Sequence, residues 1–146
     1  MRRFIFVIHF QNSVALKRED VTLIFDIGKT TKKVLLFDHQ FHVVEEQTER
    51  LPEVPDDDGF PGEDIVLLSQ WVNDAIGRYT HDPRYQVTHI NFSAYGASLV
   101  HLGQQGEVIP PFYNYLKPFP ADCEDLFLKQ YDQHSDISTS TASPFL

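Results

Sequence analysis

The sequence has little of several features that mark particular functional classes. It holds one cysteine, Cys123, in 146 residues, so it can form no internal disulfide and no thiolate metal cluster, which fits a reducing, cytoplasmic compartment. Basic residues are few, since 12 Lys and Arg face 21 Asp and Glu, a net charge of −9. A chain this acidic repels phosphate backbones, which disfavours nucleic-acid binding. No apolar run reaches the roughly 20 residues that cross a bilayer, so no membrane interaction is expected.

Common catalytic and metal-binding patterns are also missing. The 7 histidines include no HExxH or similarly tight pair. Asp56–Asp58 lacks the spacing of an EF-hand loop, so a solvated acidic loop is favoured over a cation site. Ser93 and Ser98 lie outside any Gly-x-Ser-x-Gly pattern, and the acidic neighbours of Cys123 disfavour its thiolate. These absences argue against a hydrolase, a zinc enzyme or a cysteine enzyme.

Residues 1–20 are interpreted as an extension whose order the sequence leaves open. Met1–Ile8 begins like a secretory signal peptide, with two arginines and then an apolar stretch. That stretch ends at His9 without a clear cleavage site, so a displaced start codon or a disordered extension is favoured. The chain is 42% hydrophobic, which is enough to bury the core of one domain over residues 21–146.

Strand and turn signals dominate the first half of this domain. Val21–Ile27 is an apolar, β-branched run typical of a strand buried on both faces. Lys33–Asp38 predicts a second strand, and the short connection permits only an antiparallel hairpin. Val43–Arg50 predicts a third, more polar strand near a sheet edge. Leu51–Gly62 has three prolines and two glycines and no periodicity, which predicts a loop.

A helix and further strands complete the prediction of a mixed α/β domain. Glu63 and Asp64 are expected in the first turn of the helix, where carboxylates complement its dipole. Val87–Ser93 predicts another strand, Gly103–Gly106 the turn of a second hairpin, and Cys123–Tyr131 a short final helix. The long helix is predicted from an apolar stripe at helical spacing: Leu68, Trp71, Val72, Ala75, Ile76 and Tyr79.

The turn between the first two strands, Gly28–Lys32, has chemistry suited to a phosphate. It is not a P-loop, because Leu23 stands where that pattern needs its first glycine and a strand, rather than a helix, follows. The hairpin nevertheless offers backbone N–H groups, the hydroxyls of Thr30 and Thr31, and lysine ammonium groups. Asp26, at the strand end, could hold Mg²⁺ directly or through water. An ordinary hairpin with solvated lysines stays open as the alternative.

Two stretches, in this order, resemble a known family. Asp26–Lys33 resembles the first phosphate motif of the actin-like ATPase superfamily, Asp-x-Gly-x-(Thr/Ser)-x-x-(Lys/Arg). Ile90–Val100, with the hairpin through Gly106, is similar to the sugar-contacting segment of FGGY carbohydrate kinases. Its Tyr95-Gly96 pair resembles the Trp-Gly of rhamnulose kinases, so the likeness within the family is to rhamnulose and fuculose kinases. The resemblance covers residues 21–146.

The resemblance implies a ribonuclease H-like, actin-like ATPase fold, a mixed sheet with flanking helices, and ATP-dependent phosphorylation of a sugar hydroxyl. It implies that Asp26 organises Mg²⁺ and that the ATP phosphates face Gly28, Lys29, Thr30 and Thr31. The sugar would lie near Tyr95, Gly96 and Ala97. The implied ligands are therefore ATP, Mg²⁺ and a small-molecule sugar.

Departures from the family pattern leave the sugar and the extent of the enzyme open. Lys29 replaces a commoner small or hydroxyl residue, and Ser98 stands where rhamnulose kinases carry a sugar-contacting aspartate. Tyr115–Lys117 falls where relatives often show aromatic-Asp-Arg. Family members are several times longer and encode the catalytic base further on, so residues 21–146 are interpreted as part of an amino-terminal kinase domain, truncated and inactive alone. Exposed apolar surface would favour self-association. A non-catalytic actin-like binding or regulatory module is the alternative.

Overall fold

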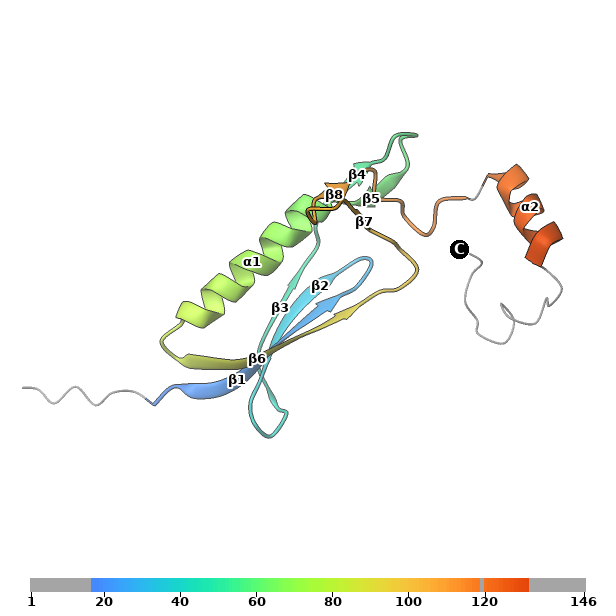
Figure 1. Ribbon diagram of the computed structural model, residues 1–146. Coiled ribbons are helices and arrows are strands. Elements are labelled where there is room, and N and C mark those ends of the chain that lie inside the picture. Colours follow the sequence, from blue (N-terminus) through green and yellow to red (C-terminus); the bar gives the residue numbers. More distant parts are fainter. Residues whose placement is uncertain (1–16, 119, 132–146) are drawn as a thin grey trace, which may run out of the picture.

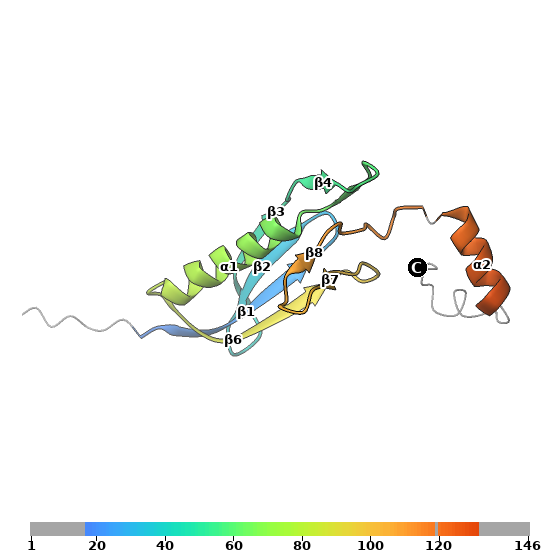
Figure 2. The ribbon, with the colours of Figure 1, turned by 45° about the horizontal axis from the view of Figure 1, so that its top comes forward.

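A computed structural model describes residues 17–118 and 120–131 of the chain. Most of the expected amino-terminal extension, residues 1–16, lies outside the described residues. The centre of the molecule is a four-stranded sheet in the order β3-β2-β1-β6, with helix α1 packed across one face (Figure 1). Two small sheets, β4-β5 and β7-β8, lie near the first turns of α1 (Figures 1 and 2). The predicted mixed α/β architecture is confirmed.

The central sheet combines an antiparallel meander with one parallel strand. β1 (Glu19–Ile27) pairs antiparallel with β2 (Lys32–Phe37), and β2 with the edge strand β3 (Val43–Glu49). β6 (Tyr85–Ala94) runs parallel to β1 at the other edge, after a crossover through α1 (Ile65–His81). Parallel neighbours need such a crossover. The predicted strands are confirmed, with ends that differ by one or two residues.

The core lies between α1 and one face of the sheet. Phe25 is at its centre, with its ring edge-on to Trp71 at 5.6 Å and stacked on Phe92 at 4.9 Å between centroids. The prediction that the first strand is buried on both faces is wrong. Thr22 and Ile24 are only half-buried, because no described element covers the face opposite α1. The buried apolar residues are Val21, Leu23, Phe25, Val34, Leu36, Ala75, Tyr79 and Tyr85.

Hydrogen bonds join the polar edge strand β3 to α1, and Val44 of this strand packs against the core. Every second residue from Glu45 to Glu49 accepts a hydrogen bond from a helix side chain. A strand repeats every two residues and a helix every 3.6, so the two periods set donors opposite acceptors. Trp71 packs on the core, as predicted, while its indole N–H reaches β3. The pairs are Trp71 with Glu49, Arg78 with Gln47, and Tyr79 with Glu45.

The segment predicted as a loop before α1 contains a hairpin instead. Its strands are β4 (Glu53–Pro55) and β5 (Pro61–Glu63), paired antiparallel. Asp56 closes the turn, because its Oδ1 accepts hydrogen bonds from the amides of Asp58 at 3.0 Å and Phe60 at 2.9 Å. Strands this short have no periodicity to detect, which is why the prediction of a loop was wrong.

The start of α1 also differs from the prediction. Asp64 is the N-cap and accepts a hydrogen bond from the amide of Leu67 at 2.9 Å, so the helix begins at Ile65. Glu63 is therefore not in the first turn of the helix. It belongs to β5 and is buried.

The remaining elements follow β6. β7 (His101–Leu102) and β8 (Val108–Ile109) form the predicted second hairpin. α2 (Ala121–Tyr131) begins two residues earlier than predicted and lies apart from the sheet (Figure 2). Among the described residues, no helix combines the length and apolar character needed to cross a membrane.

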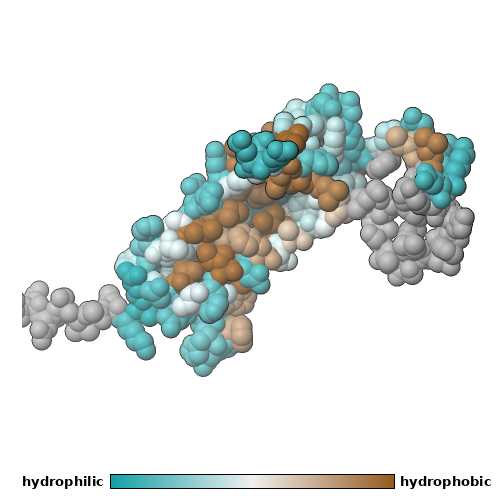
Figure 3. Space-filling view, in the orientation of Figure 1, coloured by the Kyte–Doolittle hydropathy of each residue, from teal (hydrophilic) through white to brown (hydrophobic). Residues whose placement is uncertain are grey.

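Apolar surface is exposed between α1 and β6 and around the β7-β8 hairpin (Figure 3). On β6, Ile90 is 41% and Phe92 51% exposed. Both lie opposite core residues of β1, Leu23 and Phe25, whereas α1 packs against the first part of this edge strand, at Tyr85. The helix thus covers the core residues of β1 and β2 and leaves β6 partly open.

Candidate functional site

The predicted site residues meet at one edge of the central sheet. β1 ends at Ile27 and the parallel β6 at Ala94, and the amide of Tyr95 donates to the carbonyl of Ile27 at 3.0 Å. The turn Gly28–Thr31 therefore lies beside the segment Tyr95–Ala97, although the two are far apart in sequence. The carboxyl ends of parallel strands are where open α/β sheets bind ligands.

The turn after β1 is tight and carries free amides. The amide of Gly28 donates to the carbonyl of Thr31 at 3.0 Å. A Cβ on Gly28 would lie 2.8 Å from that carbonyl oxygen, so this close approach requires glycine. Within the described part of the chain, the amides of Lys29, Thr30 and Thr31 have no hydrogen-bond acceptor. Consecutive free N–H groups of this kind suit an anion.

Every lysine of the hairpin is paired with a glutamate. The outermost pair is exposed: its hydrogen bond raises the pKa of Lys33 and lowers the pKa of Glu46. The positive charge of the hairpin is thus balanced, and the amides of the turn are left as its unpaired donors. The three ion pairs are Lys29 with Glu53, Lys32 with Glu63, and Lys33 with Glu46.

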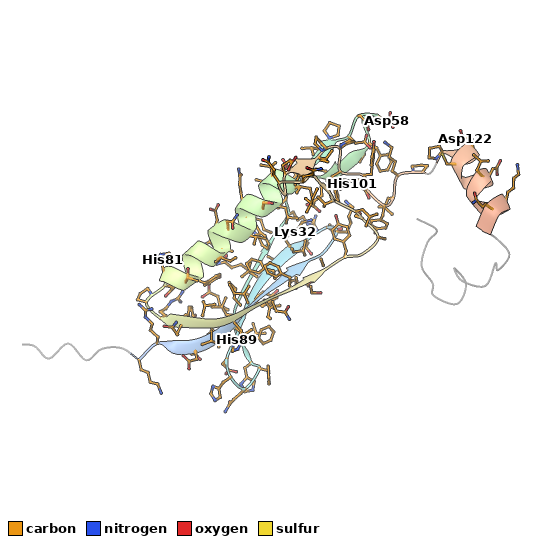
Figure 4. All side chains as sticks on the ribbon, in the orientation of Figure 1. Lys32, Asp58, His81, His89, His101 and Asp122 are labelled. Carbon is orange, nitrogen blue, oxygen red and sulfur yellow. The ribbon has the colours of Figure 1, made fainter. Side chains whose placement is uncertain are left out.

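Lys32 is buried beneath the turn. Its side chain, 2% exposed, lies between α1 and the sheet (Figure 4). Its Nζ donates to the carbonyls of Gly28 at 3.0 Å and Lys29 at 3.3 Å, and to Glu63 Oε2 at 2.7 Å. The same carboxylate oxygen accepts a hydrogen bond from the Tyr95 hydroxyl at 3.2 Å. Burial, and then the nearby Glu63 carboxylate, raises the pKa of Tyr95 to about 12. Hydrogen bonds thus link the turn to the segment after β6.

Asp26 lies on the opposite face of the sheet. It is in register with Lys33 on β2 and Ser93 on β6, so the three side chains form a row. The Asp26 side chain is exposed and has no hydrogen bond or ion pair to the described residues. An unpaired carboxylate at a strand end fits Mg²⁺, a hard cation that prefers oxygen ligands.

The segment after β6 forms an open bend. The ring of Tyr95, half-buried, lies 6.1 Å from that of Tyr115 between centroids. Gly96 is exposed, and a Cβ there would have no neighbour within 4 Å. Ala97 has a φ of 69°, which is uncommon for a residue with a side chain. Ser98 Oγ is buried without a hydrogen bond of normal geometry to the described residues. The open space at the exposed Gly96 suits a hydroxyl-bearing ligand.

A groove of about 480 Å³ borders the turn on the α1 side of the sheet. Its lining includes the cations Lys29, Lys32 and Arg50, the carboxylates Glu53 and Glu63, and the amide of Asn114. Asn114 is buried, and its amide donates to the carbonyl of Pro61 at 2.8 Å, which fixes this wall of the groove to β5. The groove makes the turn accessible, and Arg50 is the cation of this lining that lies outside the ion pairs of Lys29 and Lys32.

The acidic turn Asp56–Asp58 is bound by one lysine. Lys117 Nζ donates to Asp56 Oδ2 at 2.6 Å and Asp58 Oδ2 at 2.7 Å, and lies 4.7 Å from the centroid of the Tyr113 ring. The hydrogen bond from Lys117 holds the pKa of Asp56 below its usual range. Carboxylate oxygens of the three aspartates lie within 4.8 Å of one another, but the ammonium group already neutralises part of their charge. This agrees with an acidic loop rather than a cation site.

The sequence prediction missed Glu63 as a residue of the site. A signal was present in β2, where Lys32 follows the same alternation as the core residues Val34 and Leu36. A lysine at a core position needs a buried acidic partner, because an unpaired buried charge is strongly unfavourable. Glu63 is that partner.

The structure is similar to those of several carbohydrate kinases. A carbohydrate kinase from Novosphingobium aromaticivorans matches with a TM-score of 0.68 and 24% identity, over 78% of this chain and 23% of that one. Gluconate kinase from Lactobacillus acidophilus matches with a TM-score of 0.61 and 19% identity, over 84% of this chain and 24% of that one. Plasmodium falciparum glycerol kinase, solved with ADP, matches with a TM-score of 0.58 and 15% identity, over 82% of this chain and 24% of that one.

The likeness is one of fold. No protein-family model matches the sequence, and no curated protein matches it. The fold is nevertheless the mixed α/β fold of carbohydrate kinases, the actin-like ATPase fold. The chain spans about a quarter of the length of these kinases.

Proposed function

We propose that this chain is the amino-terminal part of an FGGY-type, ATP-dependent carbohydrate kinase, which transfers the γ-phosphate of ATP to a sugar hydroxyl. The observation that carries the proposal is the meeting of its two family-like segments at one sheet edge, where the Tyr95 amide bonds the Ile27 carbonyl at 3.0 Å. The shared fold of the kinases supports it.

The turn Gly28–Thr31 binds the ATP phosphates. The free amides of Lys29, Thr30 and Thr31 donate to phosphate oxygens, and the absence of a side chain on Gly28 permits the close turn. Lys29 turns from Glu53 toward the phosphates when they bind, because a phosphate carries more charge than one carboxylate. The turn therefore positions the phosphates mainly through its backbone.

Asp26 holds Mg²⁺, directly or through water, on the face of the sheet that it shares with Lys33 and Ser93. When bound, this ion offsets the negative charge that develops on the transferring phosphoryl group. Lys33, in register with Asp26 and ion-paired with Glu46, brings an ammonium group to the same face of the sheet. Phosphoryl transfer depends mainly on positioning and electrostatics, and these are what Asp26 and Lys33 supply.

The sugar binds at Tyr95, Gly96 and Ala97. The open space at Gly96 receives sugar hydroxyls. Likeness of the Tyr95-Gly96 pair to Trp-Gly favours a sugar of the rhamnulose or fuculose kind. The structurally similar proteins include a gluconate kinase and a glycerol kinase, so polyhydroxylated substrates of different lengths suit this fold.

We assign no catalytic base within this chain. Since it spans about a quarter of the similar kinases, the base comes from the rest of the enzyme and the chain alone turns over no ATP. Its single cysteine and acidic composition support a cytoplasmic enzyme, and the exposed apolar side chains of β6 support self-association of the isolated chain.

Titration of the ¹⁵N-labelled chain tests this proposal. Mg·ATP is expected to shift the amide signals of Lys29, Thr30 and Thr31, and rhamnulose those of the Tyr95–Ala97 segment. Gly28→Ala should abolish the response to Mg·ATP, since its Cβ would lie 2.8 Å from the Thr31 carbonyl.

Gly77→Ala is the matched control, because a Cβ at this helix position meets nothing within 4 Å. This variant should respond to Mg·ATP as the wild type does. If Mg·ATP leaves the amide signals of the turn unshifted, or shifts them equally in Gly28→Ala, the proposed phosphate site is contradicted.

A further inference from the structure

Lys32 orients the turn Gly28–Thr31 by holding two of the turn's carbonyl groups. From inside the protein, Lys32 Nζ donates hydrogen bonds to the carbonyl oxygens of Gly28 at 3.0 Å and Lys29 at 3.3 Å. A trans peptide unit is planar, and its C=O and N–H point in opposite directions. Because the two carbonyls point inward to Lys32, the amides that share their peptide units, those of Lys29 and Thr30, point outward. The direction of these amides depends on where Lys32 lies.

Glu63 in turn sets the position of Lys32. An ammonium group has three N–H donors, and Lys32 directs one to each of the two carbonyls and one to Glu63 Oε2 at 2.7 Å. Glu63 is 4% exposed, and water has little access to either partner. A buried charge pair without solvent has few alternative arrangements, so a displacement of Glu63 also displaces Lys32.

The Tyr95 hydroxyl donates a hydrogen bond to the same oxygen, Glu63 Oε2, at 3.2 Å. The ammonium group of Lys32 also lies over the face of the Tyr95 ring, with Nζ 6.0 Å from the ring centroid. Its backbone is tied to the end of β1 through the Ile27 carbonyl. Tyr95 is therefore the point at which the segment after β6 contacts the buried ion pair.

We propose that Lys32, Glu63 and Tyr95 are positioning residues that couple the segment after β6 to the turn after β1. A ligand that immobilises Tyr95 thereby orients the amides of Lys29 and Thr30, and an anion bound by those amides immobilises Tyr95. The ligands involved, a sugar and Mg·ATP, rest on the proposed function; the coupling itself rests on the hydrogen bonds. Such coupling is reciprocal, so each ligand raises the affinity for the other by the same factor.

The first test needs no ligand. Tyr95→Phe keeps the ring and removes only the hydroxyl, so it is expected to shift the amide signals of Lys29 and Thr30 and to accelerate their hydrogen exchange. Tyr113→Phe is the control, because its hydroxyl bonds Asp57 on an exposed loop at 3.2 Å. It should leave the turn signals unchanged. If the amide signals of Lys29 and Thr30 are unchanged in Tyr95→Phe, or change equally in both variants, the proposed coupling is overturned.

The second test measures the coupling between ligands. The dissociation constant for Mg·ATP is measured with and without saturating rhamnulose, in the wild type and in Tyr95→Phe. The sugar should tighten Mg·ATP binding about fivefold or more in the wild type, and hardly at all in Tyr95→Phe. Equal coupling in both proteins would show that the ion pair has a structural role only.

The two tests separate this inference from the proposed function. If neither ligand binds the wild type, the proposed function fails, while the ligand-free spectra still decide whether Tyr95 controls the turn. If both ligands bind but the turn signals are insensitive to Tyr95→Phe, the coupling fails and the proposed function stands.

Discussion

Lys32 Nζ lies 2.7 Å from Glu63 Oε2, and the two side chains are only 2% and 3% exposed. A buried ion pair loses much of its attraction to the loss of hydration of both charges, so it adds little net stability. Its geometric consequence is larger, because it joins β2 to β5, just before the N-cap of α1. The pair thus connects the antiparallel hairpin to the crossover that leads to β6.

Replacing one partner of this ion pair should destabilise the fold by more per substitution than replacing both partners together. Lys32→Met and Glu63→Gln each leave one buried group without its partner, with an expected loss of roughly 3–5 kcal/mol in the free energy of unfolding. The double variant should lose at least 1 kcal/mol less than the sum of the single losses. Urea unfolding of the four proteins measures this. The exposed pair Lys33 and Glu46, changed in the same way, should leave stability near the wild-type value; strictly additive losses at Lys32 and Glu63 would contradict a coupled pair.

Acid should loosen the β4-β5 turn through Asp56. Lys117 lowers the pKa of this carboxyl in the folded state, so the unfolded chain binds its proton more readily. The resulting stability is present above the ordinary Asp pKa of about 3.9 and is lost as pH falls below it toward the lowered native pKa. Lys117→Met should therefore flatten the fall of unfolding free energy below about pH 4. Urea unfolding at a series of pH values measures the slope, and equal slopes in both proteins would rule out this contribution.

Glu53 competes with the ATP phosphates for Lys29, so replacing Glu53 should strengthen the binding of Mg·ATP. Glu53→Gln releases Lys29 from its ion pair and adds one net positive charge at the turn. Mg·ATP affinity should rise, on the order of threefold to tenfold at low salt, with a smaller gain at high salt because ions screen exposed charges. Asp82→Asn, at the other end of α1, changes net charge equally and is the control. Calorimetric titration compares the three proteins; a gain shared by Asp82→Asn would point to net charge rather than to Lys29.

Gly96→Ala separates sugar binding from folding. A Cβ at this position has no protein neighbour within 4 Å, so the thermal midpoint should hardly change. The methyl group would fill the space assigned to the sugar, and rhamnulose affinity should fall about tenfold or more, as expected when a methyl group blocks a contact worth 1.4 kcal/mol. Amide shifts on titration measure the affinity. Undiminished rhamnulose binding would move the sugar site away from Gly96.

The main elements of the fold could be predicted because their periodicity is strong. The apolar alternation of β1 and β2, the glutamates of β3 and the helical stripe through Trp71 and Tyr79 each follow from side-chain spacing. The β4-β5 hairpin could not be predicted in this way. Its strands have three residues each, and its prolines and glycines are equally typical of a loop.

Part of the candidate site could be proposed from sequence and part depends on tertiary contacts. Asp26 and the turn Gly28–Thr31 could be proposed as ligand-binding residues because their motif is local in sequence. Glu63 was interpreted as a helix-dipole carboxylate, since nothing in its own neighbourhood indicates that it pairs with a lysine from β2. Such a pairing, between residues from different strands, is visible only once the chain is folded.

A nucleotide site at Asp26 requires that ATP binding depend on magnesium. ATP is titrated calorimetrically into the wild-type chain with excess Mg²⁺ and with excess EDTA, and into Asp26→Asn with Mg²⁺. We expect the wild type to bind Mg·ATP, EDTA to weaken binding at least tenfold, and Asp26→Asn to lose this dependence on Mg²⁺. Absence of ATP binding, or binding equally strong with EDTA and in Asp26→Asn, would contradict a nucleotide site at Asp26 and the turn that follows it.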